Sequence, residues 1–450
     1  MLTQKEFENI PIALEESTAM SVPNEPIEIF EGAFNFKLDE TDRLHAANGR
    51  LEIVWQPTIR IKLFCEYESS ESIGFHDLFL AEYIFLKMDS EIFYKCFITK
   101  SSSNKRLIQG ELMETPFFGN IDANIDHVLF DVPNLRKFHG DIVKRELDGG
   151  LSSTSSRLVL TNKKFITILE MRHSFDSLSE TLRNEGGYLF LHNGLIKKKR
   201  NNQLMTHEDL KNQIQCLDFF LSFFNGRAVC AMFLKGKVGH QKVWEDYQYL
   251  NTENYRSSFS WAPTNIKSKH LQSLWSSFCK IWNYREDSSF LTFAVKWYNE
   301  ANMNEVSTDT RLIMAQTTLE LIYNWWLIEK NQLITINDAN NLAAENKIRL
   351  VLAQIGISYE IPVEFTGLIL QKKKQVFKDG PNSIVYIRNS LVHSNTNKIK
   401  GVTNLPPETR GEAVILANWY IELALLKILD YNGKYQKRMG GVELVPWVNT

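Results

Sequence analysis

Apolar and polar residues alternate over much of the first 200 positions. Three segments show the pattern, with β-branched and aromatic residues between turn residues: GRLEIVWQPTIRIKLFCEY (49–67), RLVLTNKKFITILEM (157–171) and GYLFLHNGLIKKKR (187–200). Runs of this kind are typical of β-strands. The stretch DGGLSSTSS (148–156) predicts an exposed loop between strands. We therefore expect a β-rich N-terminal domain over residues 1–205.

The spacing of apolar residues becomes helical after position 205. Thr206 is a candidate N-cap, with Glu208 and Asp209 in the first turn. Apolar residues then recur at spacings of three and four: Leu210, Ile214, Leu217, Phe220 and Leu221. The pattern predicts a helix starting at Thr206. With the mixed, aromatic-rich stretch that follows, it forms a predicted connector over residues 206–287.

Six segments with helical spacing occupy residues 288–450. They are 288–301, 307–328, 337–356, 362–378, a segment from Pro381, and 406–431. Five of them open with a capping residue or a proline: Ser288, Asp309, Asn337 or Asp338, Pro362 and Pro406. The fold class predicted is α+β, a β-rich N-terminal region followed by an all-α C-terminal bundle.

Composition and charge exclude several classes of protein. The 450 residues are 44% hydrophobic and 23% charged, as in ordinary folded proteins, and the net charge of −2 gives no global field for nucleic acid. Five scattered cysteines, none in CxxC spacing, indicate buried thiols rather than disulfides or a zinc site. No apolar run suits a membrane span, and the N-terminus lacks a signal peptide pattern, so we expect a cytoplasmic protein. No metal or nucleotide motif appears, so no cofactor is expected.

The segment PNSIVYIRNSLVHSN (381–395) carries the candidate chemistry. An Asp-Gly-Pro break precedes it, and proline suits the first helical position, so a helix is predicted to start there. One side of this helix is apolar, formed by Ile384, Val385, Ile387, Leu391 and Val392. Arg388 lies inside that apolar arc, whereas Asn389 and His393 lie on the opposite, more polar side.

A cation on the apolar side of a helix needs an acceptor, because an unpaired buried charge is costly. Glu320 is a candidate, since it shares a helical stripe with Leu312, Gln316, Tyr323 and Leu327. Facing inward, its carboxylate would accept a bidentate bond from Arg388. The alternative is that Glu320 lies at the boundary and is solvated. The sequence leaves both open.

Local charge distinguishes Arg388 and His393 from a chance match. An arginine followed by a histidine also occurs in RNNQLMTH (200–207), where no helix holds the pair. Residues 372–400, however, contain seven cations and one acid, a local charge of +6. Such a segment suits a phosphate backbone, although a solvated helix face is the alternative. The candidate RNA-binding residues are Lys372, Lys373, Lys374, Lys378 and Lys398.

The segment VYIRNSLVHSN (385–395) resembles the Rx4–6H signature helix of the HEPN superfamily. The order of FLTFAVKWYNEA, DTRLIMAQTTLELIYNWW and NKIRLVLAQIG before it is similar to that of ApeA-like HEPN domains. THEDLKNQIQCLDFFLSFFNGRAV, GELMETPFFGN and VLFDVPN also resemble upstream regions of those anti-phage proteins. The resemblance covers the whole chain loosely and residues 288–431 more specifically.

The resemblance implies a metal-independent endoribonuclease with RNA as substrate, acting as a toxin in abortive infection. It implies a HEPN-like bundle, with Arg388 and His393 as catalytic pair and Asn389 as support; Glu320 is added from the packing argument. It also implies a homodimer or higher homo-oligomer through the C-terminal domain. A phage-derived trigger would act at the N-terminal domain.

RNA supplies its own nucleophile, the 2′-hydroxyl, so the expected products are a 2′,3′-cyclic phosphate and a 5′-hydroxyl. Five residues on a regular helix place Arg388 and His393 about 140° apart. The helix therefore ends or distorts near His393, or Arg388 bends around, or a second protomer contributes. The alternative function is a non-catalytic HEPN-type module that binds RNA or nucleotides or mediates assembly; a plain interaction scaffold is a third.

Overall fold

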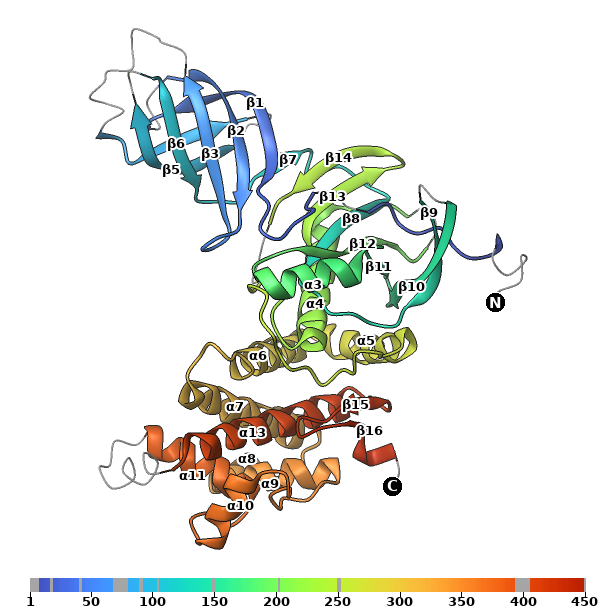
Figure 1. The fold of residues 1–450 in the computed structure, drawn as a ribbon, viewed down its shortest axis with the longest axis vertical. Helices are drawn as coiled ribbons and strands as arrows, with labels where there is room; N and C mark the ends of the chain where they lie inside the picture. Colours follow the sequence, from blue (N-terminus) through green and yellow to red (C-terminus); the bar gives the residue numbers. More distant parts are fainter. Residues whose placement is uncertain are drawn as a thin grey trace.

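The computed structural model describes residues 8–16, 19–39, 43–67, 80–88, 92–102, 105–147, 150–200, 203–248, 252–392 and 405–448. Three parts follow one another along the longest axis of the molecule: a β-barrel, a larger sheet with helices, and a helical part (Figure 1). The chain is therefore mixed, with a β-rich N-terminal half and a helical C-terminal half.

The first part is a closed barrel in which the described strands pair in the order β1-β2-β3-β6-β5-β4. They are β1 (Ile27–Lys37), β2 (His45–Val54), β3 (Arg60–Tyr67), β4 (Tyr83–Lys87), β5 (Phe93–Ser102) and β6 (Leu107–Leu112). Buried residues alternate with more exposed ones along β3 and β6, because every second side chain points into the barrel. The predicted β-segment 49–67 is confirmed as parts of the paired strands β2 and β3.

The second part is an antiparallel sheet with the strand order β7-β14-β13-β8-β12-β11-β10-β9. Its strands are β7 (Phe117–Gly119), β8 (His127–Pro133), β9 (Asp141–Leu147), β10 (Gly150–Thr161), β11 (Phe165–Met171), β12 (Phe190–Lys198), β13 (Met232–Val238) and β14 (Gln241–Asp246). Two helices belong to it, α3 (Phe175–Glu185) and α4 (His207–Asn225). The strands predicted within 157–171 and 187–200 are confirmed.

The helix predicted from Thr206 is confirmed as α4. Thr206 is its N-cap: the Thr206 hydroxyl accepts from the Asp209 amide, and the Asp209 carboxylate accepts from the Thr206 amide, both at 3.2 Å. Such a reciprocal pair satisfies two amides that a helix start otherwise leaves unbonded. Local sequence alone was enough to predict this feature.

Two expectations for the sheet need correction. Residues 150–156, predicted as part of a loop, extend β10 and pair with β9, because a hairpin ladder uses main-chain groups and tolerates serine side chains. The domain boundary expected after residue 205 also falls inside this sheet. Strands β13 and β14 follow α4 in the chain, yet β13 pairs with β8.

The third part is helical. Its helices are α5 (Ser268–Trp282), α6 (Arg285–Ala301), α7 (Thr308–Ile322), a π-helical continuation η1 (Tyr323–Lys330), α8 (Ile336–Asn340), α9 (Ala344–Ile355), α10 (Thr366–Lys373), α11 (Gly380–Val392) and α13 (Pro407–Ile428). The mostly buried α13 lies at the centre and contacts α6, α7, α9, α10 and α11. A small hairpin, β15 (Lys434–Gln436) and β16 (Val442–Leu444), and a 3-10 turn, η2 (Pro446–Val448), follow it, so this region is not all-α.

All six predicted helical segments contain helix, but several boundaries differ. The segment 337–356 forms two helices, α8 and α9, and 362–378 contains only the shorter α10. Pro406 is confirmed as the N-cap of α13, whereas α7 is capped by Ser307 rather than Asp309, and α6 begins before Ser288. In α7 the Ser307 hydroxyl, two positions before Asp309, takes the capping position that the sequence assigned to Asp309.

All five cysteines are buried and none forms a disulfide, as predicted. Among the described helices, none combines the length and apolar character needed to cross a membrane.

Candidate functional site

Helix α11 carries the candidate site, and contacts at its first turn fix its start. The Asp379 carboxylate accepts from the Asn382 amide at 2.8 Å. Arg349 of α9 donates to the same carboxylate from Nε at 2.8 Å and Nη2 at 2.6 Å. The predicted start at the Asp-Gly-Pro break is therefore confirmed, and an ion pair ties it to α9.

The apolar side predicted for α11 is confirmed up to Ile387, whereas Leu391 is partly buried and Val392 is exposed. Ile384, Val385 and Ile387 are buried, and the helix contacts α7, α9 and α13. Gly380 allows the close approach to α13, because a Cβ there would lie 2.4 Å from the Tyr420 hydroxyl. These contacts pack α11 against its neighbours from its first residue to Ile387, the residue before Arg388.

Arg388 is partly buried and has no carboxylate partner among the described residues. Its Nη1 donates to the side-chain oxygen of Asn389 at 3.2 Å, and its Nε is buried without an acceptor. A guanidinium has five donors, so most of its capacity is unused. Asn389, predicted as a supporting residue, is the group that bonds to it.

Glu320 does not pair with Arg388 as one alternative predicted. Its side chain is 43% exposed at the edge of α7 and accepts from Lys347 of α9 at 3.2 Å. Its stripe neighbours Leu312, Gln316, Tyr323 and Leu327 are buried, as the periodicity indicated. The boundary position was thus the correct alternative for Glu320, whose side chain is half-exposed.

His393 lies outside the described residues, and so does Lys398. The structure therefore places one member of the expected catalytic pair and not the other. Val392, the last described residue of α11, directly precedes His393 and is 43% exposed.

The predicted RNA-binding lysines lie at the other end of α11 from Arg388. Lys373, Lys374 and Lys378 are exposed, whereas Lys372 forms an ion pair with Glu360. The helix between Gly380 and Arg388 rises by about 12 Å, since each residue adds about 1.5 Å. The structure thus does not gather the lysines around Arg388, but an extended RNA strand of a few nucleotides spans that distance.

A buried charge network in the helical part was not predicted. The Tyr298 hydroxyl donates to Glu422 at 2.6 Å, and Arg438 donates to both Glu422 oxygens at 2.7 and 3.0 Å. Burial raises the pKa of Tyr298. The network joins α6, α13 and the C-terminal hairpin. The sequence feature that could have indicated this network is Glu422, a single glutamate within the apolar run of α13.

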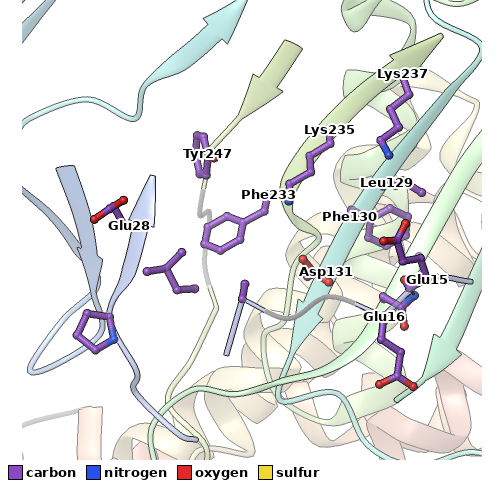
Figure 2. Close-up of a pocket in the computed structure, with 15 residues that line it drawn as sticks. Glu15, Glu16, Glu28, Leu129, Phe130, Asp131, Phe233, Lys235, Lys237 and Tyr247 are labelled. Atoms are coloured by element: carbon purple, nitrogen blue, oxygen red, sulfur yellow. Dashed lines mark hydrogen bonds between the residues drawn. The ribbon is translucent and has the colours of Figure 1, made fainter. Parts of the chain in front are cut away.

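A cavity of about 450 Å³ lies between the barrel and the sheet (Figure 2). Figure 2 shows that charged groups of both signs line it: Glu15, Glu16, Glu28, Asp131, Lys235 and Lys237. Phe233 on β13 also lines it and has a positive φ of 55°, a strained conformation for a non-glycine residue. Mixed charge in a cavity of this size suits a small ligand or a peptide segment carrying both signs.

Among the described residues, no cluster of three or more His, Cys, Asp or Glu side chains is arranged to hold a metal ion.

Comparison with known proteins gives two family matches and one relative. Residues 120–258 match the model described as YopA central domain, and residues 285–448 match the YopA C-terminal domain. The chain is 26% identical to the SPbeta prophage-derived uncharacterized protein YopA of Bacillus subtilis (strain 168), over 97% of this chain and 98% of that protein. No solved structure matches. The family matches cover the eight-stranded sheet with its helices, except for strand β7, and the helical part from α6.

Proposed function

We propose that this chain is a metal-independent endoribonuclease with a HEPN-like helical part, in which RNA is cleaved at the C-terminal end of α11. The observation that supports this most directly is Arg388, whose guanidinium bonds to the neutral Asn389 and to no described carboxylate. A partly buried cation without a counter-charge is suited to bind an anion such as a phosphate.

In the proposed reaction the RNA 2′-hydroxyl attacks the adjacent phosphorus. His393 takes or gives the proton, because an imidazole titrates near neutral pH. Arg388 donates to the phosphate oxygens as negative charge builds, and Asn389 holds the guanidinium through Nη1. The bond to the 5′-oxygen breaks, giving a 2′,3′-cyclic phosphate and a 5′-hydroxyl.

The exposed Lys373, Lys374 and Lys378 extend the proposed RNA contact to the other end of α11. Each would neutralise one phosphate, which makes RNA affinity depend on salt. These lysines also favour the second candidate function, a non-catalytic RNA-binding or assembly module. That candidate assigned Arg388 a structural pairing with Glu320, and Glu320 instead pairs with Lys347.

The proposed role is defence against phage by abortive infection, with the protein in the cytoplasm. The relative in Bacillus subtilis is named as prophage-derived, and a resident prophage benefits when its host excludes other phages. The proposed trigger is phage-derived and binds the N-terminal half. The cavity between barrel and sheet is the candidate place for it.

The test is cleavage of an end-labelled RNA pool in excess EDTA by wild type, His393→Ala and Arg388→Ala. Loss of the general base or of the phosphate contact should lower the rate at least about a hundredfold. His240→Ala, at an exposed histidine, is the matched control and should cut like wild type.

Products with linear 3′-hydroxyl ends would contradict the proposed chemistry. Equal cutting by His393→Ala and wild type would remove His393 from the reaction. A wild-type chain that neither cuts RNA nor slows cell growth on expression would favour the non-catalytic module.

A further inference from the structure

A second cavity, of about 620 Å³, lies where α3 and the end of α4 meet the segment 255–258. Its lining includes Arg136, Arg183, Arg227 and Arg256, and we call it the arginine pocket. Lys137 also lines it, and the only carboxylates in the lining are Asp176 and Glu180. Cations therefore outnumber acids by five to two in a cavity larger than the one in Figure 2.

Arg136 has no acceptor for its guanidinium among the described residues. Its Nε is buried without a partner, and the contact that its side chain makes is with the ring of Phe224, 5.7 Å from the centroid. Burial lowers the pKa of Arg136 to about 10, which still leaves it charged at neutral pH. The side chain is partly buried, and a partly buried cation without an acceptor is suited to bind an anion.

Arg227 is held in place without being neutralised. It is 4% exposed and donates to the main-chain oxygens of Arg256 at 2.5 Å and Asn134 at 2.6 Å. Its Nε has no partner, and Tyr255 covers the guanidinium at 4.5 Å. Carbonyl acceptors fix the orientation of the side chain, and Glu253, the carboxylate whose charge acts on it, is already paired with Arg256.

Two other cations in the lining, Arg256 and Lys137, are paired with carboxylates. Arg256 pairs with Glu253 at 2.7 Å and Glu305 at 3.2 Å, and Lys137 pairs with Asp176 at 2.7 Å. Tyr298 and Glu422 act on the charge of Arg136 and oppose the lowering of its pKa by burial, so a structural role for Arg136 would depend on them. Both Glu422 oxygens, however, already accept from Arg438.

We propose that the arginine pocket binds a phosphorylated small molecule of nucleotide size, with Arg136 and Arg227 on the phosphate oxygens. Guanidinium groups match phosphate geometry, and the volume exceeds what a single phosphate fills. Ser258 and Thr264 also line the cavity and offer hydroxyl groups to the rest of the ligand. The site is separate from α11 and does not depend on RNA cleavage.

The test is calorimetric titration of the full-length chain with ADP and with inorganic phosphate. We expect ADP to bind at least about tenfold more tightly than phosphate, and Arg136→Gln to weaken ADP binding about tenfold or more. Arg183→Gln, at an exposed pocket residue, should weaken it about two- to fivefold. Arg200→Gln, an exposed arginine outside the pocket, is the matched control and should bind like wild type.

Thermal unfolding without ligand separates a binding role from a structural one. Arg136→Gln removes an unpaired cation, so we expect its Tm to equal or exceed that of wild type. Two results together would assign Arg136 to the fold and overturn the proposal. They are a Tm of Arg136→Gln below that of wild type and unchanged ADP binding by Arg183→Gln. The absence of ADP binding to wild type, or binding of single-stranded RNA at this pocket in place of ADP, would also overturn it.

Discussion

Arg388 and Arg438 show how differently the same side chain is held within the helical part. Arg438 is 4% exposed and donates hydrogen bonds to both carboxylate oxygens of Glu422, which is fully buried. Arg388 is partly buried and bonds to a neutral amide. The charge of Arg438 is therefore neutralised inside the protein, whereas Arg388 remains a cation able to bind an anion.

Glu422→Gln should be strongly destabilising. The amide keeps an acceptor for Tyr298 but leaves Arg438 buried without a counter-charge, so we expect the free energy of unfolding to fall by about 3 kcal/mol. Urea denaturation measures this.

Glu320→Gln is the matched control, because Glu320 forms a partly exposed pair with Lys347 at the edge of the helical part. Its cost should stay below about 1 kcal/mol. Similar losses for the two variants would show that the buried network is no more important than a surface pair.

At the scale of elements, the local sequence predicted those features of helices and strands that depend on residues close together in the chain. The reciprocal cap of α4, the start of α11 after Asp379 and the apolar side of α11 follow from residues within one or two turns. The extension of β10 through residues 150–156 does not, because its ladder is completed by β9. The break between α8 and α9 was also missed.

Two glycines in neighbouring helices should respond in opposite ways to the same change. Gly380→Ala would place a Cβ 2.4 Å from the Tyr420 hydroxyl, so α11 must shift from α13, and we expect a loss of about 1–3 kcal/mol. Gly411→Ala on α13 meets no atom within 4 Å and should gain about 0.5–1 kcal/mol, since alanine favours helix.

Urea denaturation of both variants tests this pair. If Gly380→Ala were neutral, the packing of α11 on α13 would be looser than the contact distance indicates. The proposed anchoring of Arg388 would then lose its support.

At the scale of the whole molecule, hydrogen bonds connect the sheet to the helical part. Asn302, at the end of α6, donates to the Gly226 carbonyl at 2.7 Å and accepts from Arg438 at 2.9 Å. Arg256 of the arginine pocket donates to the Asn302 carbonyl at 3.3 Å. Arg256, which lines that pocket, is therefore connected through Asn302 to the buried network of Tyr298, Glu422 and Arg438.

If α11 continued as a regular helix to His393, Arg388 and His393 would face different sides of it, so we predict that the proposed nuclease acts as a dimer with shared clefts. Mixing inactive Arg388→Ala with inactive His393→Ala should then restore about a quarter of wild-type cleavage, since half the dimers are mixed and one of their two clefts is intact. The measurement is RNA cleavage after the two proteins are denatured and refolded together.

Each variant refolded alone is the control and should stay inactive. No recovery in the mixture, with both variants folded and dimeric, would place Arg388 and His393 of one protomer in the same cleft. The helix would then have to distort near His393.

The sequence by itself determined the succession of a β-rich half and a helical half, the start of α4 and α11, the burial of the cysteines and the apolar side on which Arg388 lies. These depend on periodicity and on groups close in the chain. Only the tertiary structure decided that Glu320 pairs with Lys347, that β13 returns to the sheet beyond α4, and that Arg136 and Arg227 meet in one cavity. Each of these joins residues far apart in the chain, and no local pattern specifies which distant groups the packing brings together.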